Sequence, residues 1–141
     1  MRRWLGALLV ALALAGCGSS GLTPSQLRTS ATRICGVANQ ELNTIALPEA
    51  PSAGQHFISR GIAVLTPEVA KLRALRGTGT FQTAVAATAA ELAALRFTLK
   101  GLRAGNDPVV AIKTLEQRLL PLETRANTAW RTLSISSCVS R

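Results

Sequence analysis

Residues 81–104 have the sequence FQTAVAATAAELAALRFTLKGLRA, and this stretch decides the fold class. Its larger apolar side chains return every three or four residues, which is the repeat of one face of an α-helix. Thr80 can cap the start and Gly105 follows the end, so we expect a single long helix here. The members of the stripe are Phe81, Val85, Thr88, Leu92, Leu95, Leu99 and Leu102.

Residues 24–46 form another predicted helix. Thr23 can cap its start, Pro24 suits its first position, and Gln26 completes a capping-box pattern. Pro48 lies just beyond the helix and ends it, because the residue before a proline disfavours helical backbone. Its apolar stripe consists of Leu27, Ala31, Ile34, Ala38, Leu42 and Ile45.

Two further predicted helices, residues 53–76 and 108–133, each contain an internal proline. Pro67 leaves two alternatives: the helix kinks there, or it stops and restarts with Thr66 as a cap. We favour a kink, because the apolar stripe keeps its phase across the proline, and the same reasoning predicts a kink at Pro121. The stripes are Ile58, Ile62, Leu65, Val69 and Leu72 in the earlier segment and Ile112, Leu115, Leu119, Leu122, Ala126, Ala129 and Leu133 in the later one.

No segment shows the two-residue alternation of a strand, and nothing in the sequence repeats. A chain of 141 residues fits one domain. Short turns between long helices favour antiparallel neighbours. The sequence therefore predicts an all-α domain, an up-down-up-down four-helix bundle over residues 23–141.

The first residues have the order of a secretory signal peptide. Arg2 and Arg3 precede an apolar run over residues 4–15, which is shorter than the roughly 18–20 residues of a membrane-spanning helix. We expect residues 1–16 to be removed. The loss of these two arginines lowers the formal net charge from +9 to +7.

Leu14-Ala15-Gly16-Cys17 resembles the lipobox of bacterial lipoproteins, in which an aliphatic residue, a small residue and Gly or Ala precede a cysteine. The resemblance covers residues 1–17. It implies diacylglycerol on the Cys17 thiol and an anchor on the outer face of the cell membrane. The alternative is a plain secretory peptide with a chance cysteine. Residues 17–22 then provide the lipidated start and a flexible Gly/Ser tether.

With Cys17 lipidated, Cys35 and Cys138 are the two cysteines left, and an oxidising compartment favours a disulfide between them. Two free thiols are the alternative. The bond would join positions 103 apart and stabilise the fold by about 4–5 kcal/mol. The bundle topology brings both cysteines to one end, but Cys35 lies roughly 16 Å into its helix. Either residues 134–138 fold back, or the first helix starts later.

Beyond the lipobox, the layout resembles that of small uncharacterised actinobacterial lipoproteins. The shared features are Ile34-Cys35 with Asn39 nearby, leucine-rich helices, and Cys138 near the end of the chain. The resemblance covers much of the chain and implies no activity.

The sequence offers little for catalysis, and we expect neither enzyme activity nor a metal or cofactor. His56 is the single histidine, and the seven acidic residues are scattered rather than paired. No glycine-rich phosphate loop or Gly-x-Ser-x-Gly motif occurs. An enzyme with a site assembled in space stays an alternative, and its candidate residues are Asn39, Asn43, Arg125 and Asn127.

The predicted helix 81–104 carries a second face opposite its leucine stripe. This face has small residues and one aromatic, which suits a partner or a second copy of the chain. The alternative is that the helix simply packs on two neighbours. The residues of this candidate partner face are Ala86, Ala90, Ala93, Phe97 and Gly101.

Basic residues cluster near two helix ends, where cations also interact favourably with the helix dipole. The first cluster, Lys71, Arg73 and Arg76, is expected on the side of the tether and can attract anionic lipid headgroups. The second, Arg96, Lys100 and Arg103, is expected at the far end and can meet an anionic envelope polymer. Nucleic acid is not an expected partner, because aromatics are not interleaved with these charges.

These observations favour a lipid-anchored envelope lipoprotein that acts as a non-catalytic binding module. Its partner would be another envelope protein, an anionic polymer or a second copy of the chain. The alternative is a carrier of an apolar, lipid-like ligand inside the bundle. A carrier would need a cavity lined by the leucine stripes that opens near Pro67 or Pro121.

Overall fold

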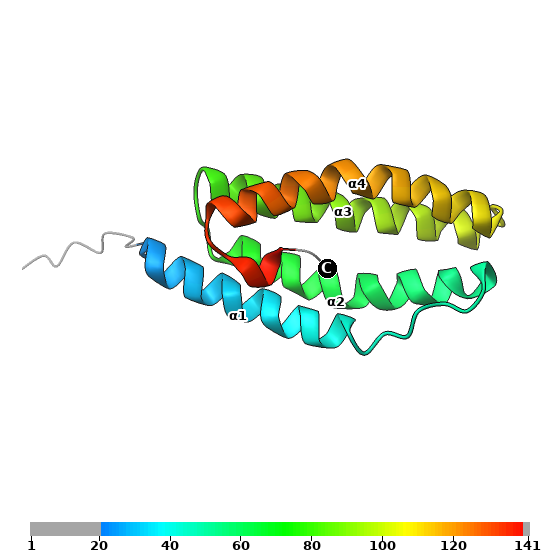
Figure 1. The fold of residues 1–141 in the computed structure, drawn as a ribbon, viewed down its shortest axis with the longest axis horizontal. Helices are drawn as coiled ribbons and strands as arrows, with labels where there is room; N and C mark the ends of the chain where they lie inside the picture. Colours follow the sequence, from blue (N-terminus) through cyan, green and yellow to red (C-terminus); the bar gives the residue numbers. More distant parts are fainter. Residues whose placement is uncertain (1–20, 140–141) are drawn as a thin grey trace, which may run out of the picture.

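The computed structural model describes residues 21–139; the expected signal peptide, Cys17 and most of the predicted tether lie outside this range. Four α-helices follow one another: α1 (Pro24–Leu42), α2 (Gly54–Ala74), α3 (Thr80–Arg103) and α4 (Pro108–Thr132). Two short 3-10 helices, η1 (Pro51–Ala53) and η2 (Ser136–Cys138), accompany them, and the described range contains no strand. Successive helices run in opposite directions (Figure 1), so the predicted up-down-up-down bundle is confirmed.

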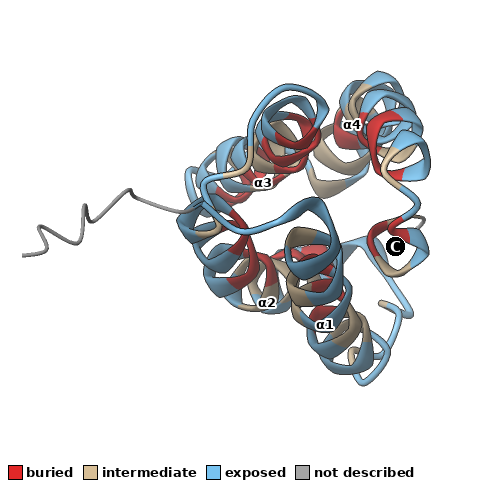
Figure 2. Cartoon of the chain, turned by 90° about the vertical axis from the view of Figure 1, so that its left-hand side faces the viewer, coloured by how far each residue is buried: buried red, intermediate tan, exposed pale blue. Residues whose placement is uncertain are grey.

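The bundle is closed on one side by the C-terminal segment rather than by a helix pair. α1 packs on α2, α2 on α3, and α3 on α4, whereas α1 and α4 have no close backbone contact. The segment that contains η2 touches both α1 and α4 and lies between them (Figure 2). This short segment therefore completes the core that α1 would otherwise leave open.

The helix ends follow local hydrogen bonding. Thr23 and Gln26 form the predicted capping box, and the Asp107 side chain accepts from the backbone N–H of Val110 to cap α4. Thr80 does not cap α3 as predicted; it is the first helical residue, and Gly79, with a φ of +57°, occupies the cap position. A glycine tolerates this backbone conformation without a Cβ clash.

α1 ends at Leu42, before the predicted end at residue 46. The backbone N–H groups of Thr44 and Ile45 bond to carbonyls three residues back, which tightens the last turn and ends the α-helix. Ile45 nevertheless stays half-buried. The apolar stripe therefore continues beyond the last helical residue. For this reason the periodicity of the sequence predicted a helix that is too long.

Both internal prolines lie within continuous helices. α2 continues through Pro67 and α4 through Pro121, so the stop-and-restart alternative at Pro67 is wrong. Both prolines are exposed, which places the missing backbone N–H on the solvent side of each helix. The hydroxyl of Thr66 also donates to the carbonyl of Ile62, at 2.7 Å, one turn before the proline.

The largest core cluster lies where α2 and α4 end and α3 begins. Trp130 is fully buried there and meets Phe81 edge to face, with ring centroids 5.6 Å apart. Its indole N–H donates to the Thr88 hydroxyl at 3.2 Å, so the buried polar atom is satisfied. A smaller cluster at the opposite end contains four buried residues, Ile58, Leu99, Leu102 and Leu115.

The C-terminal segment folds back along α1 to form the disulfide. Ser134 has a φ of +56°, which reverses the chain after α4, and Cys35 and Cys138 are bonded with their Cα atoms 5.1 Å apart. The Asn39 amide donates to the Ser137 carbonyl at 2.6 Å, which fixes the segment on α1. The fold-back alternative is thus confirmed, and the later start of the first helix is wrong.

Candidate functional site

Two of the sequence-predicted sites concern cysteines. Cys17, the expected lipid attachment point, lies outside the described residues. Cys35 and Cys138 form the predicted disulfide and are 0% and 2% exposed. Because neither residue is open to solvent, we assign this bond a structural role.

The candidate partner face lies on the outer side of α3. Phe97 is 63% exposed, which is unusual for a large aromatic side chain in a small domain. Ala86 and Ala93 are also exposed, whereas Ala90 and Gly101 are half-buried. An exposed aromatic side chain therefore lies among small residues on one helix, as the sequence predicts.

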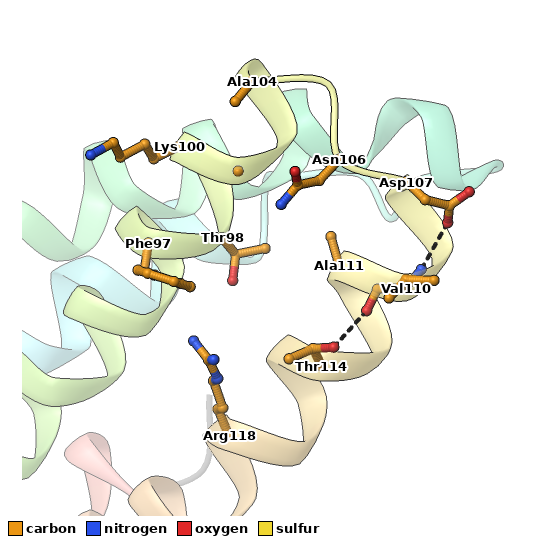
Figure 3. Close-up of a pocket in the computed structure, with 11 residues that line it drawn as sticks. Phe97, Thr98, Lys100, Ala104, Asn106, Asp107, Val110, Ala111, Thr114 and Arg118 are labelled. Carbon is orange, nitrogen blue, oxygen red and sulfur yellow. Dashed lines mark hydrogen bonds between the residues drawn. The ribbon is translucent and has the colours of Figure 1, made fainter.

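Phe97 borders a groove between the second half of α3 and the first half of α4, which we call the α3–α4 groove. Its volume is about 660 Å³, within the range of small-molecule sites. Figure 3 shows it open between the two helices, with side chains of both helices and of the connecting turn around it. The lining residues are Phe97, Thr98, Lys100, Gly101, Ala104, Asn106, Asp107, Val110, Ala111, Thr114 and Arg118.

The Arg118 side chain closes one end of this groove. Its guanidinium carbon lies 4.7 Å from the centre of the Phe97 ring, and the two side chains point toward each other from opposite helices (Figure 3). A cation–π contact does not occupy the N–H donors of the guanidinium. Within residues 21–139 Arg118 forms no hydrogen bond or ion pair, so these donors face solvent or a ligand.

Thr98 and Asn106 add polar groups to the same groove. Seven other threonines in the helices donate to the carbonyl four residues back. The Thr98 hydroxyl has no such bond within the described range, although the residue is only 7% exposed, and it points into the opening (Figure 3). The Asn106 amide lies at the same opening, over Gly101. Because the Thr98 hydroxyl faces the opening, water or a ligand in the groove can bond to it.

The charge around the groove is mainly positive. Asp107 is its only acidic lining residue, and its carboxylate is engaged in capping α4. Lys100 lies on the rim and points away from the opening (Figure 3). It also lines a second, smaller groove of about 390 Å³ between α2 and α3, together with Arg96 and Arg103.

The predicted basic clusters are both at the surface. Lys71, Arg73 and Arg76 are exposed at the end where α1 begins, and two of them, Arg73 and Arg76, line a hollow beside Phe81. The other cluster is exposed at the opposite end of the bundle, where Arg96 also donates to the Thr66 hydroxyl at 2.9 Å. The bundle topology therefore separates the two clusters as predicted.

The candidate catalytic residues do not converge. Asn39 holds the C-terminal segment and Asn43 is the C-cap of α1, whereas Arg125 and Asn127 belong to α4, which has no close backbone contact with α1. His56 is exposed. No group of three His, Cys, Asp or Glu side chains in the described range could hold a metal ion.

The pocket that includes Pro121 differs from the one a carrier of apolar ligands would need. Its lining is dominated by the threonines of α3 and α4, and none of its residues belongs to the α3 leucine stripe. Ala129 is the only member of the α4 stripe in it. This pocket is therefore a surface hollow that lies outside the leucine stripes.

One buried acid escaped the sequence reasoning. Glu68 is 3% exposed on α2, next to Val69 of the stripe. Its place on the helix, one turn from Leu65 and Leu72, could have signalled burial.

No described helix is long and apolar enough to cross a membrane. No protein-family model matches the chain, and no curated protein or solved structure matches it either. The α3–α4 groove and the Phe97 face are therefore interpreted from their own chemistry.

Proposed function

We propose that this chain is a lipid-anchored protein on the outer face of a bacterial cell membrane that acts as a non-catalytic binding module. The lipobox resemblance at Cys17 supports the anchor. The disulfide between Cys35 and Cys138 supports export, because such bonds persist in oxidising compartments. Binding is assigned to the outer face of α3, where another component of the envelope would contact Phe97.

The exposure of Phe97 carries the binding proposal. A phenylalanine that is 63% exposed loses part of the free energy of burial, which for full burial is about 1.5–3 kcal/mol. The cost is recovered when a partner covers the ring. Ala93, an exposed small residue about one turn before Phe97 on α3, would allow that partner to approach the helix closely. Aromatic and arginine side chains also dominate the energetics of known interfaces.

The anchor is tested by the mass of the chain extracted from its own membrane. We expect residues 17–141 plus lipid, less two hydrogens for the disulfide. Cys17→Ser should move the chain from the membrane to the soluble fraction. An unlipidated chain that still carries residues 1–16 would contradict the anchor.

Binding is tested by photo-crosslinking in cells. A photoreactive phenylalanine analogue at position 97 should gain the mass of another envelope component, or of a second copy of the chain. The same analogue at Leu47, which is 80% exposed in the connection between α1 and η1, serves as the control. Equal labelling at both positions would show that the Phe97 face is ordinary surface.

A further inference from the structure

We infer that the α3–α4 groove binds a small anionic amphiphile, a molecule with an apolar group and a carboxylate or phosphate head. The inference rests on the proposed binding role of the Phe97 face and specifies the chemistry of the ligand. The head would meet Arg118, Thr98 and Asn106, and the apolar group would lie on Phe97, Ala111 and Val110.

Three hydrogen-bond donors from separate parts of the chain face the groove. Arg118 comes from α4, Thr98 from α3 and Asn106 from the turn between them, and all three side chains border the opening in Figure 3. A guanidinium binds carboxylate and phosphate oxygens through paired N–H groups. An oxyanion in the groove could also accept from the Thr98 hydroxyl, which faces the opening and has no hydrogen-bond partner within residues 21–139. These groups select an anionic head.

The rest of the lining selects an apolar body. The Phe97 ring and the side chains of Val110 and Ala111 are apolar parts of the lining, and Phe97 and Val110 are 63% and 64% exposed. Gly101 has no side chain and so leaves space on the α3 side of the groove. A Cβ at this position would come within 2.6 Å of the Asn106 amide nitrogen. Covering this surface provides binding free energy in proportion to the apolar area removed from water.

Charge argues against a second copy of the chain and against a cationic ligand. Lys100 and Arg118 border the Phe97 ring, and Arg96 and Arg103 lie on the adjoining groove. A symmetric dimer through this face would bring the cations of both copies together. The same cations would repel a positively charged amphiphile and attract a negative one.

The test uses the full chain with Cys17→Ser, so that no attached lipid competes, and the fluorescent anionic probe anilinonaphthalene sulfonate. We expect saturable binding with an increase in probe fluorescence. Decanoate and decyl phosphate should displace the probe, whereas acetate, inorganic phosphate and decyltrimethylammonium should not. Displacement by inorganic phosphate alone would indicate a simple anion site, and equal displacement by the cationic amphiphile would show that charge has no role. Either result would overturn the inference.

Arg118→Gln is the decisive variant, and Arg125→Gln is its matched control, because both change an exposed arginine of α4 in the same way. We expect Arg118→Gln to weaken decanoate binding about tenfold to a hundredfold, the factor for one charge-assisted hydrogen bond. Arg125→Gln should leave it unchanged. Equal affinities for the two variants, each with an unchanged unfolding midpoint, would refute the assignment.

The anionic-amphiphile assignment and the proposed binding role of the Phe97 face can be refuted independently of each other. If decanoate does not bind but position 97 still crosslinks in cells, the face is a binding surface and the anionic-amphiphile assignment is wrong. An acidic peptide that binds where decanoate does not would have the same meaning and would point to a protein partner. If decanoate binds but position 97 gains no mass in cells, the groove chemistry stands and the proposed binding role fails.

Discussion

The two ends of the bundle are built differently. At one end, which we call the disulfide end, Trp130, Phe81 and Leu72 are buried beside the bond between Cys35 and Cys138. At the other, the groove end, four buried side chains form a smaller cluster beneath the exposed Phe97 and the α3–α4 groove. Every large side chain of the described range with less than 2% exposure belongs to the disulfide end or contacts it.

This difference suggests a division of roles. The disulfide end has the features that stabilise a fold: a large buried cluster, a long-range covalent bond and a satisfied buried indole. The groove end has a feature that costs stability in isolation, namely an exposed aromatic ring, and its Thr98 and Asn106 side chains face an open groove. Features of the second kind are common at binding surfaces, because the partner repays their cost.

The largest expected effect comes from Trp130→Ala at the disulfide end. Removing this side chain leaves a cavity and deprives Thr88 of its indole donor, so we expect a loss of about 3–5 kcal/mol in the free energy of unfolding. Chemical denaturation measures it. A loss below about 1 kcal/mol would contradict the role that we assign to the disulfide end, because its buried cluster would then not stabilise the fold.

The next effect is that of the disulfide. The double variant Cys35→Ala and Cys138→Ala should lower the free energy of unfolding by about 2–4 kcal/mol, the typical measured effect of a disulfide. This is less than the roughly 4–5 kcal/mol that loop-closure entropy alone gives for a bond that restricts the unfolded chain over most of the domain. The C-terminal segment should lose protection from hydrogen exchange first, since it retains only side-chain contacts to α1, such as that of Asn39. Uniform loss of protection across all four helices would contradict this order.

Two glycine substitutions, one at each end of the bundle, test whether the two ends differ in how tightly they are packed. At Gly77→Ala the new methyl group would collide with the Phe81 ring and lie 2.9 Å from Leu27, so we expect a loss of about 1–3 kcal/mol. At Gly101→Ala it meets only the Asn106 amide, which is exposed and can move, and alanine favours the helix by about 0.8–1 kcal/mol. The midpoint of thermal unfolding should therefore be higher for Gly101→Ala than for Gly77→Ala. The reverse order would contradict the tighter packing that we assign to the disulfide end.

The smallest stability effect is expected for Phe97→Ala. The side chain is mostly exposed and its contact with Arg118 contributes about 0.5–1 kcal/mol, so unfolding should change by no more than that amount. Decanoate affinity, measured by displacement of the fluorescent probe, should fall about tenfold. A large stability loss with unchanged affinity would make Phe97 a structural residue.

The helices were predictable because their stripes are long and keep one phase. Thr88, Leu92, Leu99 and Leu102 are buried as the repeat in α3 predicts. The chain reversal at Ser134 was not, because a positive φ at a serine has no sequence signature and depends on the disulfide and on contacts with α1. The sequence indicated only that some reversal was one way for the cysteines to meet.

The candidate site was predictable in part. Helical geometry placed Phe97 opposite the leucine stripe, and the residue is exposed as that position implies. Thr98, Asn106 and Arg118 were missed because they come from three elements whose relative rotation depends on packing. The α3–α4 turn, which brings the Asn106 amide over Gly101, gives no hint of a groove in the sequence.

Native mass spectrometry of the full chain, extracted gently from its own membrane, tests the division of roles most directly. The charge-state distribution reports whether the chain is folded, and added mass reports what is bound. We predict that the wild-type chain carries a bound mass beyond that of the lipidated chain itself. Phe97→Glu should lose this bound mass and keep the charge-state distribution of the folded chain. Equal added mass on both chains, none on either, or an unfolded distribution for Phe97→Glu would contradict the separation of fold and binding in this protein.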